Sequence, residues 1–159
     1  MALEIEKKFL LKDDSWRSQI VSSCRMTQGY IPSSGVTVRV RISESGAFLT
    51  LKGRPDENFS RSEFEYPIPL SDAREMLGEF CGTRVIDKTR YTVPAGDGLV
   101  WEIDEYYGLN AGLFTAEIEL PAPDTPFAAP PWLGEDVTGN PADTNGALSR
   151  NPYTLWGEK

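Results

Sequence analysis

Charged residues occupy every second position in seven short segments of this chain, and mostly apolar residues lie between them. Successive side chains of a β-strand point to opposite faces, so residues i and i+2 share one face. Each segment therefore predicts a strand with one charged face and one apolar face. The segments are residues 4–8, 39–41, 52–54, 61–65, 88–90, 102–104 and 117–119.

The wider pattern of apolar runs and turn residues predicts eight strands, and therefore a mainly β (α+β) fold. The sequence Glu44-Ser45-Gly46 predicts a tight hairpin, and the Pro- and Gly-containing segment 94–98 predicts another. The predicted strands are residues 3–10, 25–31, 36–43, 47–53, 61–68, 84–93, 99–106 and 113–120.

Two amphipathic segments interrupt these strands. The first covers about residues 14–24 and has Trp16, Ile20 and Val21 on one face. The second covers about residues 71–81, with Ser71 as a candidate N-cap. Its predicted apolar face contains Ala73, Met76, Leu77 and Phe80.

The chain changes character after residue 120. Five prolines between positions 121 and 131 exclude a long regular element, so we expect only a short helical turn near 142–149. The pattern shows no repeat and no second domain. We therefore predict one domain over 1–159, with strands over about 3–120 and a Pro-rich tail over 121–159.

The signs of the charges are segregated along the predicted strands. Glu-x-Glu occurs three times in them and Arg-x-Arg once. A single strand of this kind usually has a solvated face, but like charges on one face repel each other, and seven such segments together favour a binding site. We therefore expect metal ions to face the carboxylates and an anion to face the cations. Replacing Glu4 or Glu6 with Gln should then leave stability unchanged or raise it.

Composition excludes several functional classes. The net charge is −8 and the pI is near 4.6, which argues against binding to duplex nucleic acid. The sequence has no long apolar run for a membrane span, and its first residues lack the regions of a signal peptide. The two cysteines lack metal-site spacing and predict reduced thiols in a cytoplasmic protein.

The chain contains no histidine, which restricts the available chemistry. Ser-His-Asp triads, Cys-His dyads and HExxH zinc sites are all excluded. A metal must be held by oxygen ligands, which favours Mg²⁺ or Mn²⁺, with Ca²⁺ as a competitor. Proton transfer must use a carboxylate, a lysine, a tyrosine or metal-bound water.

Eight antiparallel strands can close into a barrel, and the pattern allows two arrangements of it. Apolar faces pointing inward would give an ordinary barrel with a charged exterior. Charged faces pointing inward would give a hydrated tunnel with an apolar outer wall. The helices, the Pro-rich tail or a second subunit in a homodimer would then cover that wall. The periodicity leaves both arrangements open.

The segment Glu4-Ile5-Glu6-Lys7-Lys8 resembles the Glu-x-Glu-x-Lys signature of CYTH domains, also called triphosphate tunnel metalloenzymes. The other charged segments follow in the order that this family shows, from residue 3 to about 120. The tail from Pro130 to Thr138 is similar to that of short bacterial members, including inorganic triphosphatases. The resemblance implies an eight-stranded antiparallel tunnel with a charged, hydrated interior, flanking short helices, a divalent metal and a substrate with a triphosphate group.

The resemblance also implies roles for the charged residues. The predicted substrate-binding cations are Lys8, Arg39, Arg41, Lys52, Arg54, Arg61, Lys88 and Arg90. The predicted metal ligands are Glu4, Glu6, Glu63, Glu65, Asp104, Glu117 and Glu119, and Glu65, Glu102 or Asp104 could instead orient the cations. The predicted catalytic residues are Glu4, Glu6, Lys8 and Tyr30. Tyr30 lies in a Gln-Gly-Tyr segment similar to that of short bacterial members, where this tyrosine is a candidate proton acceptor; its alternative role is aromatic packing at the barrel mouth.

Three functions are compatible with these residues. The leading hypothesis is divalent-metal-dependent hydrolysis of inorganic tripolyphosphate, a small anionic substrate. The second is a class IV adenylyl cyclase, or a nucleoside or thiamine triphosphatase, which would need a pocket for an organic group. The third is a polyphosphate-binding module without catalysis.

Overall fold

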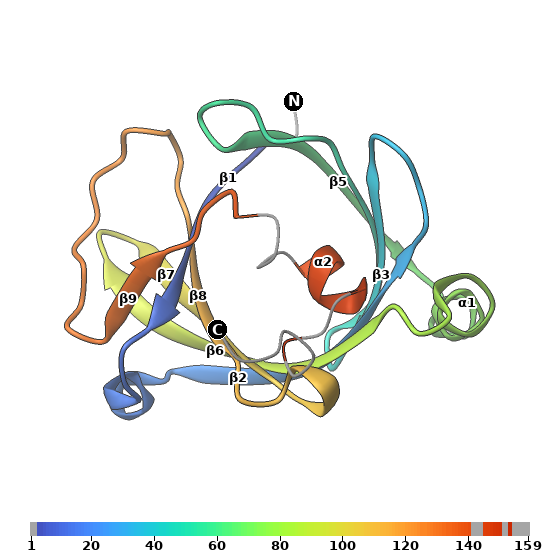
Figure 1. Cartoon of the computed structure of the whole chain (residues 1–159), viewed down its shortest axis with the longest axis horizontal. Helices are drawn as coiled ribbons and strands as arrows, with labels where there is room; N and C mark the ends of the chain where they lie inside the picture. The colour runs from blue at the N-terminus through green and yellow to red at the C-terminus, as the bar shows by residue number, and fades with distance from the viewer. Residues whose placement is uncertain (1–2, 141–144, 151–152, 154–159) are drawn as a thin grey trace.

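The eight predicted strands close into an antiparallel barrel. The computed structural model describes residues 3–140, 145–150 and 153. Neighbouring strands pair in the order β5-β4-β3-β2-β6-β7-β8-β1, and pairing of β1 with β5 closes the ring, as Figure 1 shows. The strands are β1 (Leu3–Leu11), β2 (Ser22–Ile31), β3 (Thr37–Ser43), β4 (Gly46–Lys52), β5 (Ser60–Ile68), β6 (Val85–Gly96), β7 (Leu99–Tyr106) and β8 (Phe114–Glu119).

A ninth strand, β9 (Leu133–Asp136), lies in the Pro-rich tail, where we predicted no strand. It pairs with the end of β1, in register Phe9 with Asp136 and Leu11 with Leu133. The β5 partner of β1 ends its pairing at Ile5, so β9 continues along the edge that β5 leaves. Proline excludes regular pairing only where it stands, and the last nearby proline, Pro131, precedes the strand.

The first predicted helix is much shorter than expected. Only Ser15–Gln19 (η1) is helical, as a 3₁₀ turn, and β2 begins at Ser22. Trp16 is buried as predicted, but Val21 is 66% exposed. The backbone N–H of Val21 donates to the carbonyl of Thr92 on β6, so the β2–β6 ladder captures the residues that were expected to be helical.

The second predicted helix consists of α1 (Leu70–Met76) and a π-helical turn (η2, Leu77–Cys81). Ser71 does not cap it, because the helix begins one residue earlier, after Pro69. Phe80 is 52% exposed instead of buried, since the wider π turn rotates it away from the predicted face. The turn packs closely on β2: a Cβ on Gly29 would lie 2.5 Å from Cδ2 of Leu77, so a larger residue would force the side chains of Leu77 and Cys81 to shift.

Two apolar layers cover most of the outer wall of the barrel. Helix α1 places Ala73 against Val40 and Ala47 on β3 and β4. The tail and η1 cover the other side, where Trp132 packs on Trp101 with ring centroids 5.5 Å apart. Three apolar residues on the outer faces of β1 and β5 stay exposed: Leu3, Phe64 and Tyr66.

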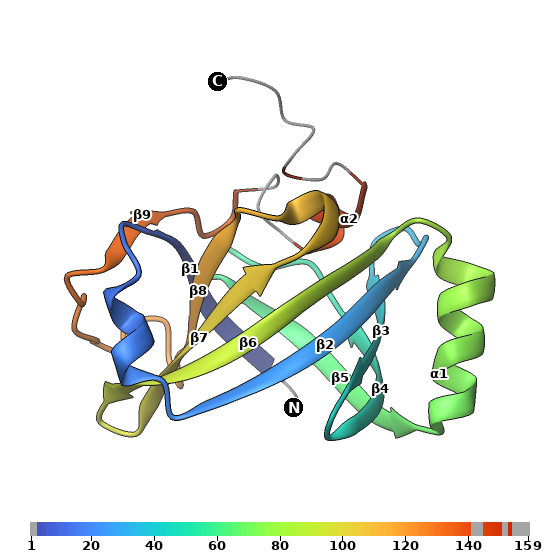
Figure 2. The same ribbon diagram turned by 90° about the horizontal axis from the view of Figure 1, so that it is seen from below.

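Helix α2 (Asn145–Arg150) covers one end of the barrel. It lies within the ring of strands in Figure 1 and at one end of them in Figure 2. Its Leu148 is fully buried in a cluster with Tyr30, Ile86, Tyr106 and Leu113. The predicted helical turn at 142–149 is thus confirmed from residue 145, and its first residues lie outside the described part. Among the described residues, no helix is long and apolar enough to cross a membrane.

Candidate active site

The charged faces of the strands point inward, around a cavity of about 580 Å³. The cavity is lined by every residue predicted above for substrate, metal or catalysis except Asp104, which is fully buried. Of the two arrangements that the sequence pattern allowed, the structure therefore shows the tunnel.

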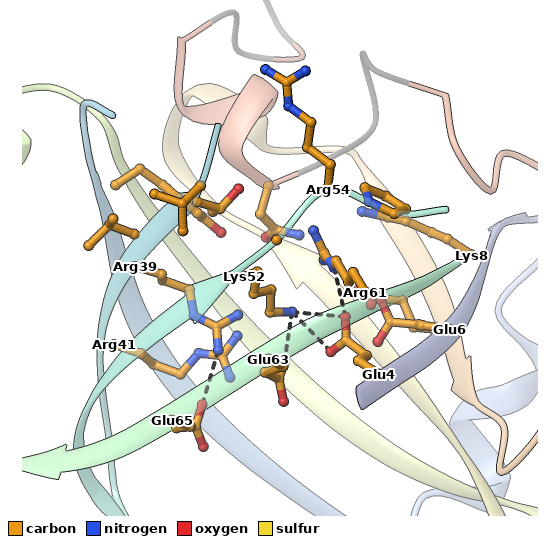
Figure 3. Close-up of a pocket in the computed structure, with 18 of the residues that line it drawn as sticks. Glu4, Glu6, Lys8, Arg39, Arg41, Lys52, Arg54, Arg61, Glu63 and Glu65 are labelled. Carbon is orange, nitrogen blue, oxygen red and sulfur yellow. Dashed lines mark hydrogen bonds and ion pairs between the residues drawn. The ribbon is translucent and has the colours of Figure 1, made fainter. Parts of the chain in front are cut away.

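One cluster on the cavity wall is centred on Glu4 and is shown in Figure 3. The Nζ of Lys52 donates to both carboxylate oxygens of Glu4, at 3.2 and 3.0 Å, and the Nε of Arg61 donates to Oε1 at 3.1 Å. Lys52 also pairs with Glu63 at 3.1 Å. Burial alone would raise the pKa of Glu4, but the hydrogen bond with Glu63 and the charges of Lys52 and Arg61 lower it to about 2.

Glu6 and Glu117 form a second cluster, with the opposite electrostatic character. Burial, together with the adjacent Glu117 carboxylate, raises the pKa of Glu6 well above its usual range. Burial would raise the pKa of Glu117 too, but the hydrogen bond with Glu6 and the charges of Lys8 and Arg90 hold it well below its usual value. The adjacent carboxyls therefore resist carrying two negative charges at once.

A third cluster joins β6 to β7 around the fully buried Lys88 and Asp104. The Nζ of Lys88 donates to Asp104 at 2.7 Å, and Arg90 donates to both oxygens of Asp104 at 2.8 and 3.0 Å. Burial lowers the pKa of Lys88 to about 7, against the opposing charge of Asp104. Arg90 also pairs with Glu102 at 3.3 Å. Asp104 thus orients two cations, while its predicted metal role stays untested.

Arg39 and Arg41 extend from β3 and lack full compensation by carboxylates. Arg39 pairs with Glu65 at 3.3 Å, but its buried Nε finds no acceptor among the described residues. The Nε of Arg41 donates to the neutral amide of Gln28 at 2.9 Å. Burial, followed by the charges of Arg39 and Arg90, lowers the pKa of Arg41 to about 10. Such buried donors favour an anionic ligand.

The remaining predicted residues occupy different parts of the cavity. Tyr30 is nearly buried, and its hydroxyl accepts a 2.8 Å hydrogen bond from Gln28. Lys8 lines the cavity, and its backbone N–H donates to the hydroxyl of Thr138 in the tail at 2.9 Å. Arg54 extends away from the Glu4 cluster in Figure 3.

Several residues of the site were not predicted from the sequence. Arg84 and Thr138 line the cavity, and Asn145 enters it from α2. None of them belongs to an alternating segment, so the pattern gave no signal for them. Gln28 did have a signal, because it shares a strand face with Tyr30, two positions on.

The carboxylates can contribute to a metal site only together with other ligands. Within residues 3–140, 145–150 and 153, no three acidic side chains form a site that could hold a metal ion. The adjacent carboxyls of Glu6 and Glu117 nevertheless fit a divalent cation, which would relieve the repulsion between their charges. Phosphate oxygens of a substrate and water would complete the coordination of a hard cation.

The sequence matches the CYTH domain family over residues 2–142. The chain belongs to this family. Membership implies a divalent metal ion as cofactor, in agreement with the paired carboxylates in the cavity.

Two CYTH relatives are similar over nearly their full length. An inorganic triphosphatase from Acetivibrio thermocellus is 42% identical over 154 residues, covering 96% of this chain and 97% of that protein. An inorganic triphosphatase from Nitrosomonas europaea is 33% identical over 150 residues, covering 92% and 96%. Among solved structures, the crystal structure of an inorganic triphosphatase matches with a TM-score of 0.63 at 31% identity, covering 94% of this chain and 95% of that one.

Proposed function

We propose that this protein hydrolyses inorganic triphosphate in its cavity, with Mg²⁺ or Mn²⁺ as the metal. The observation that carries the proposal is Arg41: its guanidinium is partly buried near the cations Arg39 and Arg90, and its only hydrogen-bond partner in the described residues is a neutral amide. A triphosphate would supply the missing negative charge. The two inorganic triphosphatases at 42% and 33% identity support this choice of substrate.

Different residues of the cavity would bind the phosphate groups and the metal during hydrolysis. Arg39, Arg41, Lys52 and Lys88 would hold phosphate oxygens and stabilise charge as the phosphoryl group transfers. Glu6 and Glu117 would hold the metal, with Glu4, Glu63 and Glu119 at the same wall of the cavity. The metal would neutralise phosphate charge and lower the pKa of the attacking water.

Tyr30 would accept the proton of that water. Tyr30 lines the cavity, and Gln28 fixes its hydroxyl. The predicted homodimer, the absence of a nucleic-acid partner and the cytoplasmic location stay predictions.

Phosphate release from tripolyphosphate, ATP and thiamine triphosphate tests the proposal. We expect tripolyphosphate to be the best substrate and Arg41→Ala to reduce kcat/KM by a factor of about 10²–10³, the scale of removing one preorganised donor. Arg74→Ala removes the same single positive charge at an exposed position of helix α1 and should leave kcat/KM unchanged. Cyclic AMP as the main product from ATP, or triphosphate binding without hydrolysis, would contradict the proposal.

A further inference from the structure

Gln28 connects two residues of the proposed active site, although it carries no charge. Its side chain is fully buried on β2. Its Oε1 accepts from Nε of Arg41 at 2.9 Å, and its Nε2 donates to the hydroxyl of Tyr30 at 2.8 Å. The same Nε2 donates to Oδ1 of Asn145 at 3.2 Å. One amide thus contacts a substrate-binding cation, the proposed proton acceptor and helix α2.

The chemistry of the partners fixes the orientation of both amides. Arg41 can only donate, so the oxygen of Gln28 must face it, and the NH₂ group must face Tyr30 and Asn145. Lys88 can also only donate, and its Nζ lies 3.0 Å from Oδ1 of Asn145. The chain of hydrogen bonds from Arg41 through Gln28 and Asn145 to Lys88 therefore has a single direction and cannot flip.

These hydrogen bonds orient the Tyr30 hydroxyl and the Arg41 guanidinium for interaction with a ligand. The N–H of Gln28 occupies one lone pair of the Tyr30 oxygen, so the O–H of Tyr30 stays free to interact with a ligand in the cavity. The bond from Nε of Arg41 fixes the plane of the guanidinium and leaves its terminal nitrogens for phosphate oxygens. Loss of Gln28 would release both side chains at once.

Asn145 acts in this network only as an acceptor. Its Oδ1 accepts from Gln28, from Lys88 and from the hydroxyl of Tyr106, the last at 3.3 Å. The buried Leu148 of the same helix anchors α2 in the apolar end of the barrel. Helix α2 thus supplies one side-chain amide oxygen, Oδ1 of Asn145, as the acceptor for three donors on β2, β6 and β7.

We propose that Gln28 is a positioning residue for Arg41 and Tyr30, and that helix α2 holds Gln28 in its working orientation through Asn145. The inference rests on the proposed triphosphatase function. In this view α2 is part of the active site, and its role extends beyond covering one end of the barrel.

A double-mutant cycle tests the inference. Gln28→Met keeps the volume and removes every hydrogen bond, Asn145→Ala removes the acceptor, and the double variant combines them. Controls are Gln19→Met on η1 and Asn58→Ala in the loop before β5, both exposed and outside the cavity. The measurements are kcat, KM for tripolyphosphate and the melting temperature of each protein.

We expect Gln28→Met to lower kcat about tenfold or more and to raise KM, because Tyr30 and Arg41 both lose their support. Asn145→Ala should change the same parameters in the same direction by a smaller factor. The double variant should lose less than the product of the two single-variant factors, since the helix acts on Tyr30 and Arg41 through Gln28, while Asn145 also supports Lys88 directly. Additive effects, or wild-type kinetics in Asn145→Ala, would overturn the inference.

Asn145→Asp keeps an acceptor for all three donors and tests the same point without touching the buried Gln28. It should recover kcat relative to Asn145→Ala at saturating substrate; no recovery would overturn the inference. A wild-type protein that releases no phosphate would refute the proposed function alone. The inference would then be judged from the Kd for tripolyphosphate, which Gln28→Met must weaken to a similar extent as Arg41→Ala.

Discussion

Glu4 and Glu6 show how differently two residues of one motif can be placed. They lie two positions apart on β1 and point into the same cavity. Glu4 lies between Lys52 and Arg61, which hold its carboxylate in the charged form. Glu6 lies beside Glu117, which disfavours a second charge. The pairing of each carboxylate depends on strands distant in sequence, so the motif itself could not predict the difference.

The different surroundings of Glu4 and Glu6 predict different effects of replacing each with Gln on the stability of the protein. Gln is neutral and resembles a protonated glutamate, so Glu6→Gln should leave the free energy of unfolding unchanged or raise it. Glu4→Gln should lower it by roughly 1–3 kcal/mol, because Lys52 and Arg61 lose a charged partner. For Glu4 this reverses our expectation from the sequence. Urea unfolding without ligand measures both values.

The pH dependence of the Glu4 effect provides a check. Its pKa is lowered to about 2 in the folded protein, below the ordinary value of 4.5, so the contribution of the carboxylate is complete above 4.5 and is lost as the pH falls toward 2. The wild-type advantage over Glu4→Gln should shrink in that window. Equal stability losses for both variants at neutral pH would contradict the assignment. Both variants should lose activity.

Lys88 predicts a pH dependence of substrate binding. In the free protein its pKa is about 7, so its positive charge is present below that pH and is lost above it. The ratio of the tripolyphosphate Kd of Lys88→Met to that of the wild type should therefore fall as the pH rises through 7. Using a ratio cancels the titration of the substrate itself. A ratio that stays constant between pH 6 and 9 would show that Lys88 keeps one charge state there.

The elements that cover the outer wall of the barrel determine its stability more than its chemistry. Trp132, just before β9, is 1% exposed and packs on Trp101 of the barrel wall. Trp132→Ala should lower the free energy of unfolding by about 3–5 kcal/mol, because it leaves a cavity between tail and barrel. Phe80→Ala, at the exposed end of the π turn, should cost less than about 1 kcal/mol. Chemical denaturation of both variants measures the difference; similar losses would place Phe80 in the core after all.

The elements also show what the sequence could and could not predict. Alternation, together with the apolar runs and turn residues, predicted all eight barrel strands and the residues that share a face, because the strand period is a local property. Strand β9 was not predicted because its four residues are too few to show an alternating pattern. The strand is stabilised by pairing with β1, which is distant in sequence. The roles of Gln28 and Asn145 depend on α2 entering the barrel, which no local signal contains.

At the scale of the whole molecule, the cavity must bind a substrate with several phosphate groups although its own wall contains carboxylates. A metal cation is needed to neutralise this negative charge. Chelation with EDTA should abolish hydrolysis, and Mg²⁺ or Mn²⁺ should restore it. Ca²⁺ should inhibit, since its looser coordination suits in-line transfer poorly. Mg²⁺ should also raise the melting temperature of the wild type, and should do so less in Glu6→Gln. Full turnover after exhaustive chelation would refute the metal assignment.

Strand β1 pairs with β5, β8 and β9, and this has a consequence for how the protein acquires its structure. The contact between Lys8 and Thr138 spans 130 positions of the chain. The strand with Glu4, Glu6 and Lys8 therefore completes its contacts only after residue 138 has left the ribosome. Such non-local pairing predicts folding in milliseconds to seconds. Neither metal nor triphosphate can assist the early stages, because the residues that would bind them come together only when the barrel closes.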